Sequence, residues 1–573
     1  MADLLTLLSD RLAPAFCAVA GEPGIDPVVR PSDRADAQAN GALALAKRLG
    51  RSPRDVAADV LAASDLAGVG TAEIAGPGFL NLTVDNEFLS ATLRDVASDD
   101  RLGIPVRPAT RIVVDYSAPN VAKEMHIGHL RTTVIGDALV RLLGFLGHDV
   151  VRENHIGDWG RPFGIHIEHL VELGALGGRQ LDLDQLDALY KDATAKFADD
   201  PDFAERARAR VVLLQRRDPD TMAVWDQLVR TSAAYWTDLY GKLGVLLTND
   251  DIVGESFYDQ MLPEVIDRLA TAGLLEESDG AQVVFPPGFT NREGEALPLI
   301  VRSSAGAFTY ATSDLACVID RVERVKADVM VYVVDGGQSQ HLSMVFAVAE
   351  MAGWLEPPRA AVHVPFGLVL GPDRKKLRSR SGEPVKFVDV VDEAIERGVA
   401  AVAAKNPGLS DSERDRIGHA VGIGALKYAD LSTDRVRDYI FDWDRMLSFD
   451  GNTSPYLQYA HTRICSLFRR AGVARGAVDL NTIHVVEDAE RMLAMRLLGY
   501  EAAVVETADR FSPHRLCAYL YELASDFTTF YEHCPVLKAD DDVRASRLAL
   551  ADITARVLAN GLGLLGIEAP EHM

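Results

Sequence analysis

Two histidines, three positions apart, stand where a β-branched run gives way to a helical pattern. The segment His126-Ile127-Gly128-His129 follows an expected strand at residues 111–117 and opens an apolar helical stripe that continues to Leu142. Open α/β sheets bind ligands where a strand ends and a helix begins. Free N–H groups and the helix dipole there attract phosphate, Gly128 allows close approach, and imidazoles can stabilise charge on a reacting phosphorus. We therefore predict a phosphate site, with a chance match to so short a motif as the alternative.

A basic stretch lies far downstream, at residues 373–386. It holds six basic residues against two acids. Such runs are usually solvated surface, so charge alone leaves open whether this one meets phosphate. The net charge of −25 argues mildly against a nucleic-acid partner, although a large acidic protein can still carry a local basic footprint. The basic residues are Arg374, Lys375, Lys376, Arg378, Arg380 and Lys386, and a second group is Arg463, Arg469, Arg470 and Arg475.

The composition is that of a globular protein that works in water. The chain has 573 residues, of which 48% are hydrophobic and 25% charged. We find no long uncharged apolar stretch and no secretory signal, so we expect no membrane segment. The five cysteines are far apart, without a C-x-x-C pair, which argues against a zinc knuckle or a disulfide framework and favours the reducing cytoplasm.

Three domains are expected around the histidine segment. Residues 1–105 alternate helical and strand-like patterns, with helices at 35–49 and from about Arg54, and a strand near residues 74–82. Residues 106–420 contain short β-branched runs separated by helices. This pattern predicts an α/β fold with a Rossmann-like, doubly wound parallel sheet and a helical insertion at about 170–250. Strand signals nearly vanish over residues 421–573, which predicts an all-α helical bundle.

A longer string of residues resembles a known family. Residues 117–131, SAPNVAKEMHIGHLR, resemble the signature of arginyl-tRNA synthetases, a class I family. The resemblance continues through residues 154–160 (NHIGDWG), 254–256 (GES), 366–370 (FGLVL) and 451–460 (GNTSPYLQYA). It implies a catalytic Rossmann domain between an N-terminal α+β domain and an anticodon-binding bundle. The implied substrates are ATP with Mg²⁺, L-arginine and tRNA(Arg), without protein-bound zinc, and we expect a monomer.

The resemblance also implies which residues hold arginine. A guanidinium is best held by carboxylates in bidentate geometry. Asp115 ends the first strand and therefore opens at the same crevice as His126, and Tyr310 and Asp314 share one face if they are helical. Without the resemblance, Asp314 could be a first-turn helix carboxylate and Tyr310 a half-buried core aromatic. The implied arginine-binding residues are Asp115, Ser117, Asn120, Tyr310, Asp314 and Gln338.

The resemblance implies that His126, Gly128 and His129 bind the triphosphate of ATP from one side and that a mobile loop binds it from the other. The matching loop, residues 371–383, departs from the usual K-M-S-K-S pattern and keeps Lys376 and Arg380. Arginine preserves the charge but not the compact geometry of lysine. We therefore predict that Lys123 reinforces the binding of the triphosphate. Further departures from the family stand at Ala305, Ser313, Gly336 and Gly337.

The two outer domains would meet tRNA. In the N-terminal domain, Phe79 and Asn81 are candidates for contact with the tRNA elbow. In the bundle, Tyr456 and Tyr459 could stack on splayed anticodon bases, Arg463 could meet the backbone, and the family also uses its terminal residue, Met573. The alternative is a helix stripe that combines a core edge with surface charge.

The expected reaction has two steps. Arginine attacks the α-phosphate of ATP to give arginyl-adenylate, and the terminal 2′-hydroxyl of the tRNA then attacks the acyl carbon. The resemblance implies that the first step needs bound tRNA. Two rival hypotheses remain: another class I enzyme or small-molecule nucleotidyltransferase, and an inactive synthetase-like RNA-binding or regulatory protein.

Overall fold

The computed structural model describes residues 4–174, 181–378 and 383–573, and the chain forms two compact units. The central unit comprises Arg107–Leu447 with Leu564–Ile567. The terminal unit comprises Met1–Val106, Ser448–Gly563 and Glu568–Met573. The expected boundary at 105/106 lies one residue from this division. The expected boundary at 420/421 falls inside helix α15 (Asp411–Leu431), and the central unit continues to Leu447.

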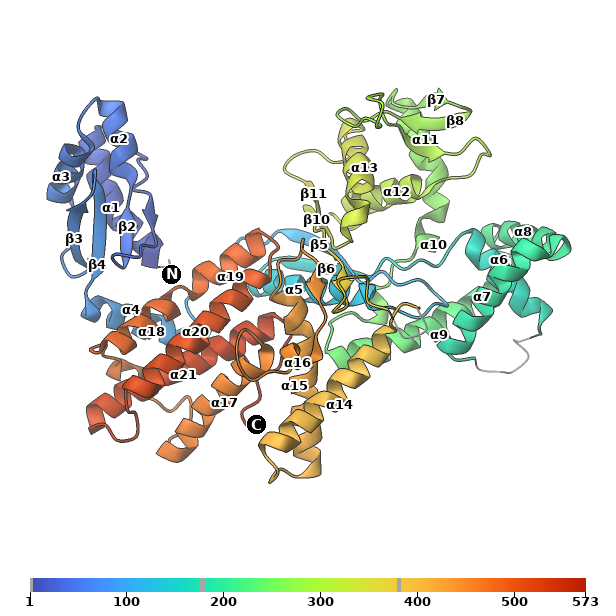
Figure 1. The fold of residues 1–573 in the computed structure, drawn as a ribbon. Helices are drawn as coiled ribbons and strands as arrows, with labels where there is room; N and C mark the ends of the chain where they lie inside the picture. The colour runs from blue at the N-terminus through green and yellow to red at the C-terminus, as the bar shows by residue number, and fades with distance from the viewer. Residues whose placement is uncertain (1–3, 175–180, 379–382) are drawn as a thin grey trace. The chain divides into compact units, whose positions relative to one another are not determined.

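A parallel sheet forms the middle of the central unit (Figure 1). Its strands are β5 (Arg111–Asp115), β6 (Asp149–Glu153), β10 (Val329–Tyr332) and β11 (Ala360–His363), in the order β11-β10-β5-β6. All three pairings are parallel. The chain moves outward from β5 to β6 and then returns to β10 on the other side of β5. The switch point of a doubly wound sheet therefore lies between β5 and β10, which confirms the expected fold class.

Helices α5 (Gly128–Phe145) and α13 (Ser339–Met351) each connect neighbouring parallel strands of this sheet. Because the two crossovers run in opposite directions and are right-handed, the helices lie on opposite faces, as Figure 1 shows. The apolar stripe expected after Ile127 is buried: Leu130, Val134, Ala138 and Leu142 are all at most 1% exposed.

The helical insertion is confirmed and begins somewhat earlier than expected. It consists of α6 (Arg161–Glu172), α7 (Leu183–Asp199), α8 (Pro201–Gln215) and α9 (Pro219–Leu243). An aspartate followed by a proline begins both α8 and α9. The Asp200 and Asp218 side chains accept hydrogen bonds from the backbone at Phe203 and Thr221, which caps the two helices.

A second addition was not expected from the sequence. Between α11 (Leu262–Thr271) and α12 (Tyr310–Glu323), the strands β7 (Glu276–Ser278), β8 (Ala281–Val284) and β9 (Leu299–Arg302) form an antiparallel sheet. The short helix α10 (Glu255–Tyr258) precedes it. One apolar core joins this sheet to α11, α12, α13 and the central strands, so the addition supports the helix that carries Tyr310 and Asp314.

The central unit ends in two long helices, α14 (Phe387–Lys405) and α15, followed by α16 (Trp443–Met446). Strands β12 (Val369–Leu370) and β13 (Tyr439–Ile440) form a short parallel pair beside them. Glycines let α14 and α15 approach closely. A Cβ atom at Gly422 would lie 2.0 Å from the carbonyl oxygen of Ala394.

The N-terminal part of the terminal unit is an α+β domain. Its antiparallel sheet has the order β1 (Val29–Arg30), β2 (Ala37–Ala39), β4 (Phe79–Val84), β3 (Gly70–Ala75). Its helices are α1 (Leu4–Ala20), α2 (Gly41–Leu49), α3 (Pro53–Ala63) and α4 (Asn86–Ser98). The expected helix at 35–49 is wrong in its first turns, because Ala37 and Ala39 are buried in β2 and the helix begins at Gly41.

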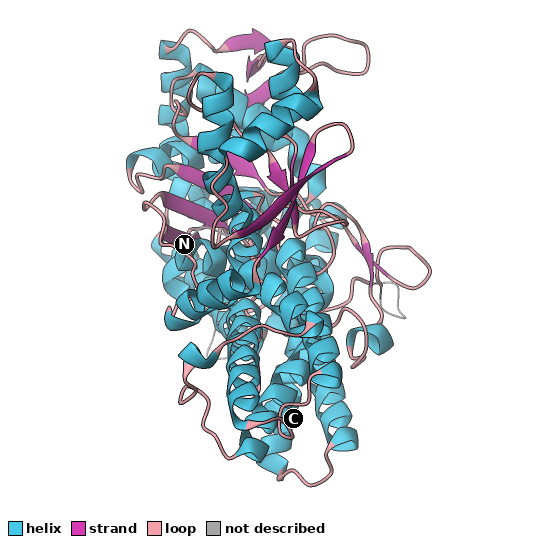
Figure 2. Cartoon of the chain, turned by 90° about the vertical axis from the view of Figure 1, so that its left-hand side faces the viewer, coloured by secondary structure: helices cyan, strands magenta, loops and turns pink. Residues whose placement is uncertain are grey.

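The C-terminal part of the terminal unit is the expected helical bundle, with helices running side by side (Figure 2). It contains α17 (Ser454–Ala471), α18 (Asp488–Leu498), α19 (Tyr500–Asp509), α20 (His514–His533) and α21 (Asp541–Leu564). Among the helices of the described residues, none is long and apolar enough to cross a membrane.

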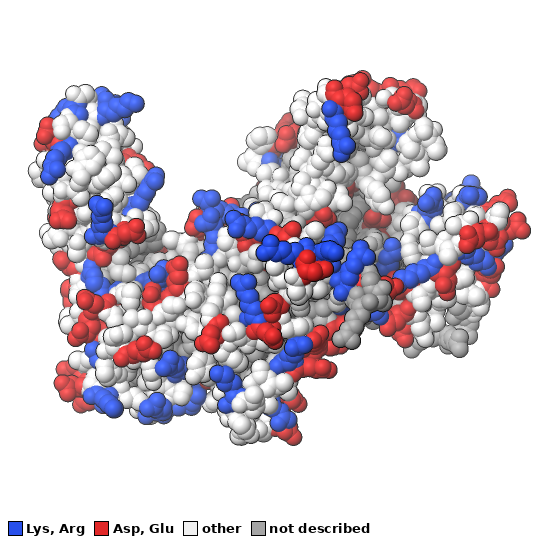
Figure 3. Space-filling view, in the orientation of Figure 1, with Lys and Arg blue, Asp and Glu red and all other residues white. Residues whose placement is uncertain are grey.

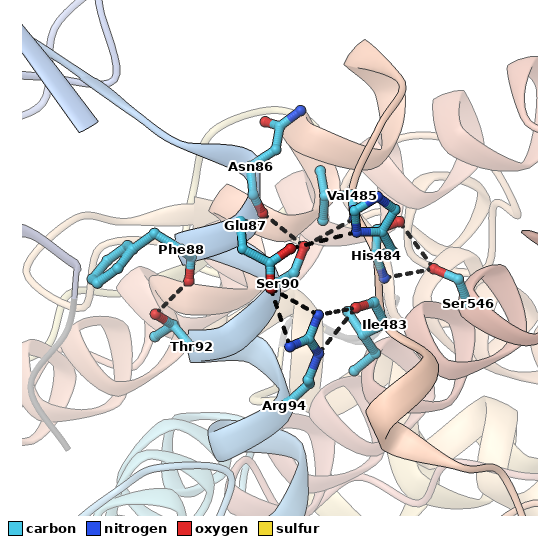
Figure 4. A network of polar contacts seen from close by, with 10 residues as sticks. All are labelled: Asn86, Glu87, Phe88, Ser90, Thr92, Arg94, Ile483, His484, Val485 and Ser546. Carbon is cyan, nitrogen blue, oxygen red and sulfur yellow. Dashed lines mark hydrogen bonds and ion pairs between the residues drawn. The ribbon is translucent and has the colours of Figure 1, made fainter. Parts of the chain in front are cut away.

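Helix α4 attaches the N-terminal domain to the bundle (Figure 4). The Arg94 guanidinium donates to the carbonyl of Ile483 from Nε at 3.1 Å and from Nη2 at 2.9 Å, and the backbone N–H of Val485 donates to Ser90 Oγ at 2.9 Å. Arg491, on α18 of the bundle, forms an ion pair with Asp36 of the N-terminal domain. These contacts make the two tRNA-facing parts expected from the sequence members of one compact unit.

The close approach of α14 and α15 gives a prediction for stability. Gly422→Ala should lower the free energy of unfolding by about 1–3 kcal/mol, because the added methyl group meets rigid backbone. Gly144→Ala is the matched control. It lies in α5 with nothing within 4 Å of the added Cβ, so it should leave stability unchanged or raise it by about 0.5–1 kcal/mol. Urea unfolding followed by tryptophan fluorescence compares them, and equal stabilities would contradict the packing.

Candidate active site

Among the cavities of the described part of the central unit, two are lined by residues expected from the sequence. One cavity, of about 470 Å³, lies at the carboxyl ends of β5 and β10. The second, of about 350 Å³, lies at the start of α5. The first is lined by Asp115, Tyr310, Asp314, Gln338, Tyr332 and His341, among others, and the second by His126, Ile127, Gly128, Leu368, Val369 and Lys376, among others.

The loop between β5 and α5 is strained. Ser117, Ala118 and Ala122 have positive φ angles of 75°, 48° and 59°, which residues other than glycine rarely adopt. Hydrogen bonds from surrounding elements hold it: Ala118 N donates to Asn154 Oδ1 at 3.0 Å, and Ala122 N to Ser232 Oγ at 2.9 Å. Strain of this kind persists only where the surroundings over-determine the conformation, and it concentrates at functional sites.

The Ser117 side chain takes part in a buried hydrogen-bond network. Its side chain is 1% exposed, and its Oγ lies 2.6 Å from the Tyr240 hydroxyl and accepts from Thr133 Oγ1 at 2.9 Å. The hydroxyl joins the loop to α5 and α9 in this structure, and its expected contact with an amino acid stays a prediction. Asn120 is exposed, and the backbone beside it pairs with Gly157.

The first turn of α5 satisfies its own backbone. Ile127 N donates to Val385 O at 2.9 Å, His129 N to His126 O at 2.8 Å, and Leu130 N to Ile127 O at 3.1 Å. His126 N donates to His129 Nδ1 at 3.1 Å, and Gly128 N to His126 Nδ1 at 3.0 Å. The expectation that free N–H groups of this turn bind phosphate is therefore wrong, since these donors already have partners.

The same hydrogen bonds determine what the histidines offer. Gly128 N donates to Nδ1 of His126, so a neutral His126 ring carries its proton on Nε2. Nδ1 of His129 lies 3.1 Å from His126 N and 3.3 Å from His126 O, so the nitrogen of His129 that carries the proton depends on the tautomer. Burial lowers the pKa of His129 to about 3, and burial and the Lys376 charge lower the pKa of His126. The rings lie 4.1 Å apart, which further disfavours two positive charges. The two rings are therefore neutral near pH 7, and His126 presents an Nε2–H donor.

The larger cavity is acidic. Asp115 lines it from the end of β5, and Asp314 lines it from α12, on the same helix face as Tyr310, which is 74% exposed. His341 Nε2 lies 2.5 Å from Asp314 Oδ2, and this hydrogen bond raises the pKa of His341. Burial, and then the charges of Asp158 and Asp314, raise the pKa of Glu255 nearby to about 7. The field in this cavity therefore favours a cation.

The sequence analysis missed several residues of this cavity. Tyr310, Asp314, Cys317 and Arg321 recur at the spacing of one helix face, so the stripe that begins with the two expected residues leads to the other two. Arg321 is fully buried and pairs with Asp115. The other missed lining residues are His155, Tyr332, Asp335 and His341.

The basic loop lies beside the histidines, as expected. Leu377 N donates to Val369 O at 3.2 Å, which folds the loop back on β12 and places Lys376 in the lining of the second cavity. Arg380 lies outside the described residues. Figure 3 shows Lys and Arg side chains gathered on this face of the central unit. Lys386, which the sequence analysis did not assign, pairs with Glu124 at 2.6 Å and Asp184 at 2.9 Å.

Lys123 points toward the helical insertion. Its Nζ lies 4.3 Å from the centre of the Tyr190 ring on α7, a cation–π contact. The His166 ring lies edge-on against the same tyrosine, 5.4 Å away. The expected action of Lys123 on phosphate remains a prediction, and Tyr190 is the side chain that orients its ammonium in this structure.

The expected tRNA contacts in the terminal unit differ in exposure. Asn81 is 5% exposed and its Oδ1 accepts from Gln38 Nε2 at 2.7 Å, so its expected RNA contact stays a prediction for a buried amide. Phe79, at the start of β4, is half-buried. On α17, Tyr459 is 45% exposed.

The other two expected residues of α17 pack against α20. The Tyr456 ring lies 5.7 Å from the Tyr521 ring, and the Arg463 guanidinium lies over the Tyr531 ring at 4.3 Å. The C-terminal tail follows the same helix, because Gln458 Nε2 donates to Glu568 O at 2.8 Å. His461 Nδ1 lies 2.9 Å from Pro570 O. Arg469 Nη1 donates to Glu571 O at 3.1 Å, so the tail runs along α17 toward the C-terminal end of that helix.

In the part of the chain that the structure describes, no cluster of three or more His, Cys, Asp or Glu side chains could hold a metal ion. None of the five cysteines, all of which lie in described residues, forms a disulfide, and four of them are buried, as expected for small apolar residues.

Family models match almost the whole chain. The models describe "tRNA synthetases class I (R), catalytic domain" over residues 92–443, "DALR anticodon binding domain" over 457–573 and "Arginyl tRNA synthetase N terminal domain" over 2–84. The arginine–tRNA ligase of Thermobifida fusca is 53% identical over 582 residues, and all of both chains is covered. The arginine–tRNA ligase of Escherichia coli O157:H7 is 45% identical over 576 residues, again with full coverage.

Solved structures agree. The arginyl-tRNA synthetase of Plasmodium falciparum superposes with a TM-score of 0.87 at 26% identity, and that of Thermus thermophilus with a TM-score of 0.81 at 27% identity. Both comparisons cover all of each chain.

The histidine geometry predicts an order of titration. His129 should titrate with the lowest pKa, near 3, because its ring is buried beside His126, while His341 should titrate above the usual value because Asp314 stabilises its charged form. Hydrogen–deuterium exchange at the imidazole C2 position, read by mass spectrometry across pH, measures both. A His129 that titrates near 6.5, as in an open peptide, would contradict the arrangement.

Proposed function

The chain belongs to the arginyl-tRNA synthetases of class I, and we propose that its two cavities divide the substrates of that family's reaction. The acidic cavity takes the arginine side chain, and the cavity at the start of α5 takes ATP. The observation that carries this proposal is the position of Asp115 and Asp314. They come from the two halves of a doubly wound sheet and line one cavity of about 470 Å³ at the switch point.

The acidic cavity suits a guanidinium. Two carboxylates that approach from different elements can each accept from the planar fork of donors, whereas the ammonium of lysine is a compact point charge that cannot match both. Tyr310 lies one helical turn before Asp314 and can cover the planar face of the guanidinium. Gln338 contributes an amide from the loop that follows β10, in the same half of the sheet. A site whose polar groups are left unpaired by the wrong ligand rejects it without a hydrolytic editing step.

The second cavity suits a nucleotide triphosphate. Leu368 and Val369 supply apolar surface for a base, and the neutral imidazoles of His126 and His129 can donate to phosphate oxygens. Lys376 adds a positive charge from the loop side. Mg²⁺ would arrive with ATP. These groups stabilise charge that develops on the α-phosphate and on departing pyrophosphate, which is the main source of catalysis where no base is needed.

The chemistry then proceeds in two transfers. A carboxylate oxygen of arginine bonds to the α-phosphorus while the bond to pyrophosphate breaks, which gives arginyl-adenylate. The 2′-hydroxyl oxygen of the terminal adenosine of tRNA(Arg) next bonds to the acyl carbon, its proton is lost, and AMP leaves. Asn120, on the exposed side of the strained loop, is the remaining candidate for the amino acid head group.

We infer that the terminal unit binds tRNA through Tyr459, with Tyr456 and Arg463 on the same face of α17, through Met573 at the end of the chain, and through Phe79 in the N-terminal domain. Aromatic faces stack on unpaired bases with little demand on sequence. We further propose that the protein acts in the cytoplasm, where its tRNA substrate is used, and as a monomer.

Pyrophosphate exchange with each amino acid, with and without tRNA(Arg), tests the proposal. Exchange with arginine only, and only when tRNA is present, is the expected result. Exchange driven by another amino acid would replace arginine specificity with a different class I activity, and no exchange with any amino acid would favour an inactive RNA-binding protein.

Asp314→Asn should raise the KM for arginine by about 10- to 100-fold, the effect of losing one charge-assisted hydrogen bond. The KM for ATP should stay unchanged. Asp320→Asn is the matched control. It lies on the same helix but pairs with Arg324 outside the cavity, so it should leave the KM for arginine within a few-fold of wild type. Equal effects of the two variants would argue against a guanidinium at Asp314.

Lys376→Ala and Lys123→Ala should each lower kcat for arginyl-adenylate formation, on the order of 100-fold for one positive group near the transferred phosphate. Lys375→Ala is the control, because Lys375 neighbours Lys376 on the same exposed loop but does not line the cavity. Single-turnover kinetics measures the step. A Lys123→Ala rate within a few-fold of wild type would show that the contact with Tyr190 is the whole role of that ammonium.

A further inference from the structure

We propose that Arg321, a residue without direct access to ligand, sets the charge of the arginine cavity by neutralising one of two adjacent carboxylates. Arg321 is thus a positioning residue that makes the cavity floor carry a single negative charge, held on Asp115. This inference rests on the proposed function, in which Asp115 binds the guanidinium of arginine.

The sheet places two carboxylates side by side. β5 and β6 are parallel, and Asp115 is the register partner of Glu153. Each residue ends its strand, and neighbouring strands lie only about 4.8 Å apart. Asp115 is 7% and Glu153 2% exposed, so water screens neither charge well. Two buried carboxylates this close do not both remain ionised unless a cation lies between them.

Arg321 is that cation. It comes from α12, is 0% exposed, and donates from Nη2 to Asp115 Oδ2 and from Nε to Glu153 Oε2, both at 2.7 Å. Its guanidinium also lies over the Tyr332 ring, 4.7 Å from the centre. Nη1 is buried without a hydrogen-bond partner in the described part of the chain. The guanidinium is therefore fixed by two carboxylates and one aromatic face.

The charges of this triad match the proposed ligand. Two carboxylates and one guanidinium leave a net charge of −1, equal and opposite to the side chain of arginine. Arg321 uses Oδ2 of Asp115, so the remaining oxygen, Oδ1, is the one available to the cavity that Asp115 lines. A buried ion pair can also be a purely structural feature. This one differs because one of its members forms the wall of the ligand cavity.

The mildest test is Glu153→Gln, which keeps the shape of the side chain and changes the triad from −1 to neutral. We expect the KM for arginine to rise about tenfold, the size of effect for one unit charge a few ångströms from a partly screened cation. The values of kcat and of the KM for ATP should change little. Asp149→Asn is the matched control, because Asp149 and Arg111 form an ion pair at the opposite ends of the same two strands.

The decisive comparison is between Arg321→Met and Arg321→Met with Glu153→Gln. In the single variant the two adjacent buried carboxylates share a proton, so Asp115 carries only part of its charge and loses the donor that orients it, and the KM for arginine should rise. The double variant restores a net charge of −1 on Asp115 and should recover most of the loss. A double variant no better than the single one, or a Glu153→Gln variant with the wild-type KM for arginine, would overturn the proposal. Because Glu153→Gln keeps the Arg321–Asp115 pair, it answers the question even if Arg321→Met fails to fold.

A pH profile adds a readout that a structural role would not move. In Arg321→Met the two carboxylates share a proton near neutral pH, so the KM for arginine should fall as pH rises, more steeply than in wild type. Burial raises the pKa of Cys317, Tyr258 and Tyr332, so these groups stay neutral in this range. The other charged or titratable groups that face the pair or lie at the cavity, present in both proteins, are Arg324, Asp314, Asp335, Glu255, His155, His341 and Tyr310.

The outcomes separate this inference from the proposed function. If Asp115→Asn leaves the KM for arginine unchanged, the assignment of the cavity fails. If Asp115→Asn raises that KM while Glu153→Gln does not, the cavity is correct and only the role of Arg321 fails.

Discussion

The register of two parallel strands determines the chemistry of the site. Because β5 and β6 end together, Asp115 and Glu153 are neighbours, and their repulsion has to be balanced inside the protein. Arg321 reaches from α12 to supply the balance. The same helix carries Asp314 toward the cavity, so the placement of α12 on the second half of the sheet determines both the counter-ion and the second acid. The added antiparallel sheet and its apolar core keep α12 in that position.

A second constraint acts at the start of α5. The first turn of α5 uses its own N–H groups on Nδ1 atoms and carbonyls, and burial keeps the imidazoles of His126 and His129 neutral. A neutral N–H donor can stay hydrogen-bonded to a phosphate oxygen while the charge of the phosphate changes during the reaction. Such a donor adds no fixed charge to the site. The positive charge comes instead from Lys376, on a loop that folds back on β12. Orientation and charge are thus supplied by different elements.

The sequence predicted the features that depend on local patterns. Runs of β-branched residues indicated the buried parallel strands, and aspartates and prolines agree with the starts of the insertion helices. The small antiparallel sheet was missed because β7, Glu276–Ser278, is short and polar and is stabilised by its pairing with β8 rather than by its own residues. The helix expected from residue 35 began late because Ala37 and Ala39 are buried in a strand.

In the candidate site, too, some residues could be assigned from the sequence and others could not. Asp115, Asp314 and Tyr310 were assigned through the family resemblance, and the structure places all three in the lining of one cavity, at a strand end and on one helix face. The roles of Ser117 and Arg321 in the structure could not be assigned from the sequence, because they depend on partners more than a hundred residues away: Tyr240 for Ser117, and Asp115 and Glu153 for Arg321.

The central claim is that two carboxylates share one guanidinium while Arg321 stays in place behind the first of them. A crystal structure with a non-hydrolysable analogue of arginyl-adenylate tests it most directly. The account predicts guanidinium hydrogen bonds to Asp115 and Asp314, with Arg321 still bonded to Asp115 and Glu153. A guanidinium bound elsewhere, or one that displaces Arg321 from Asp115, would contradict it.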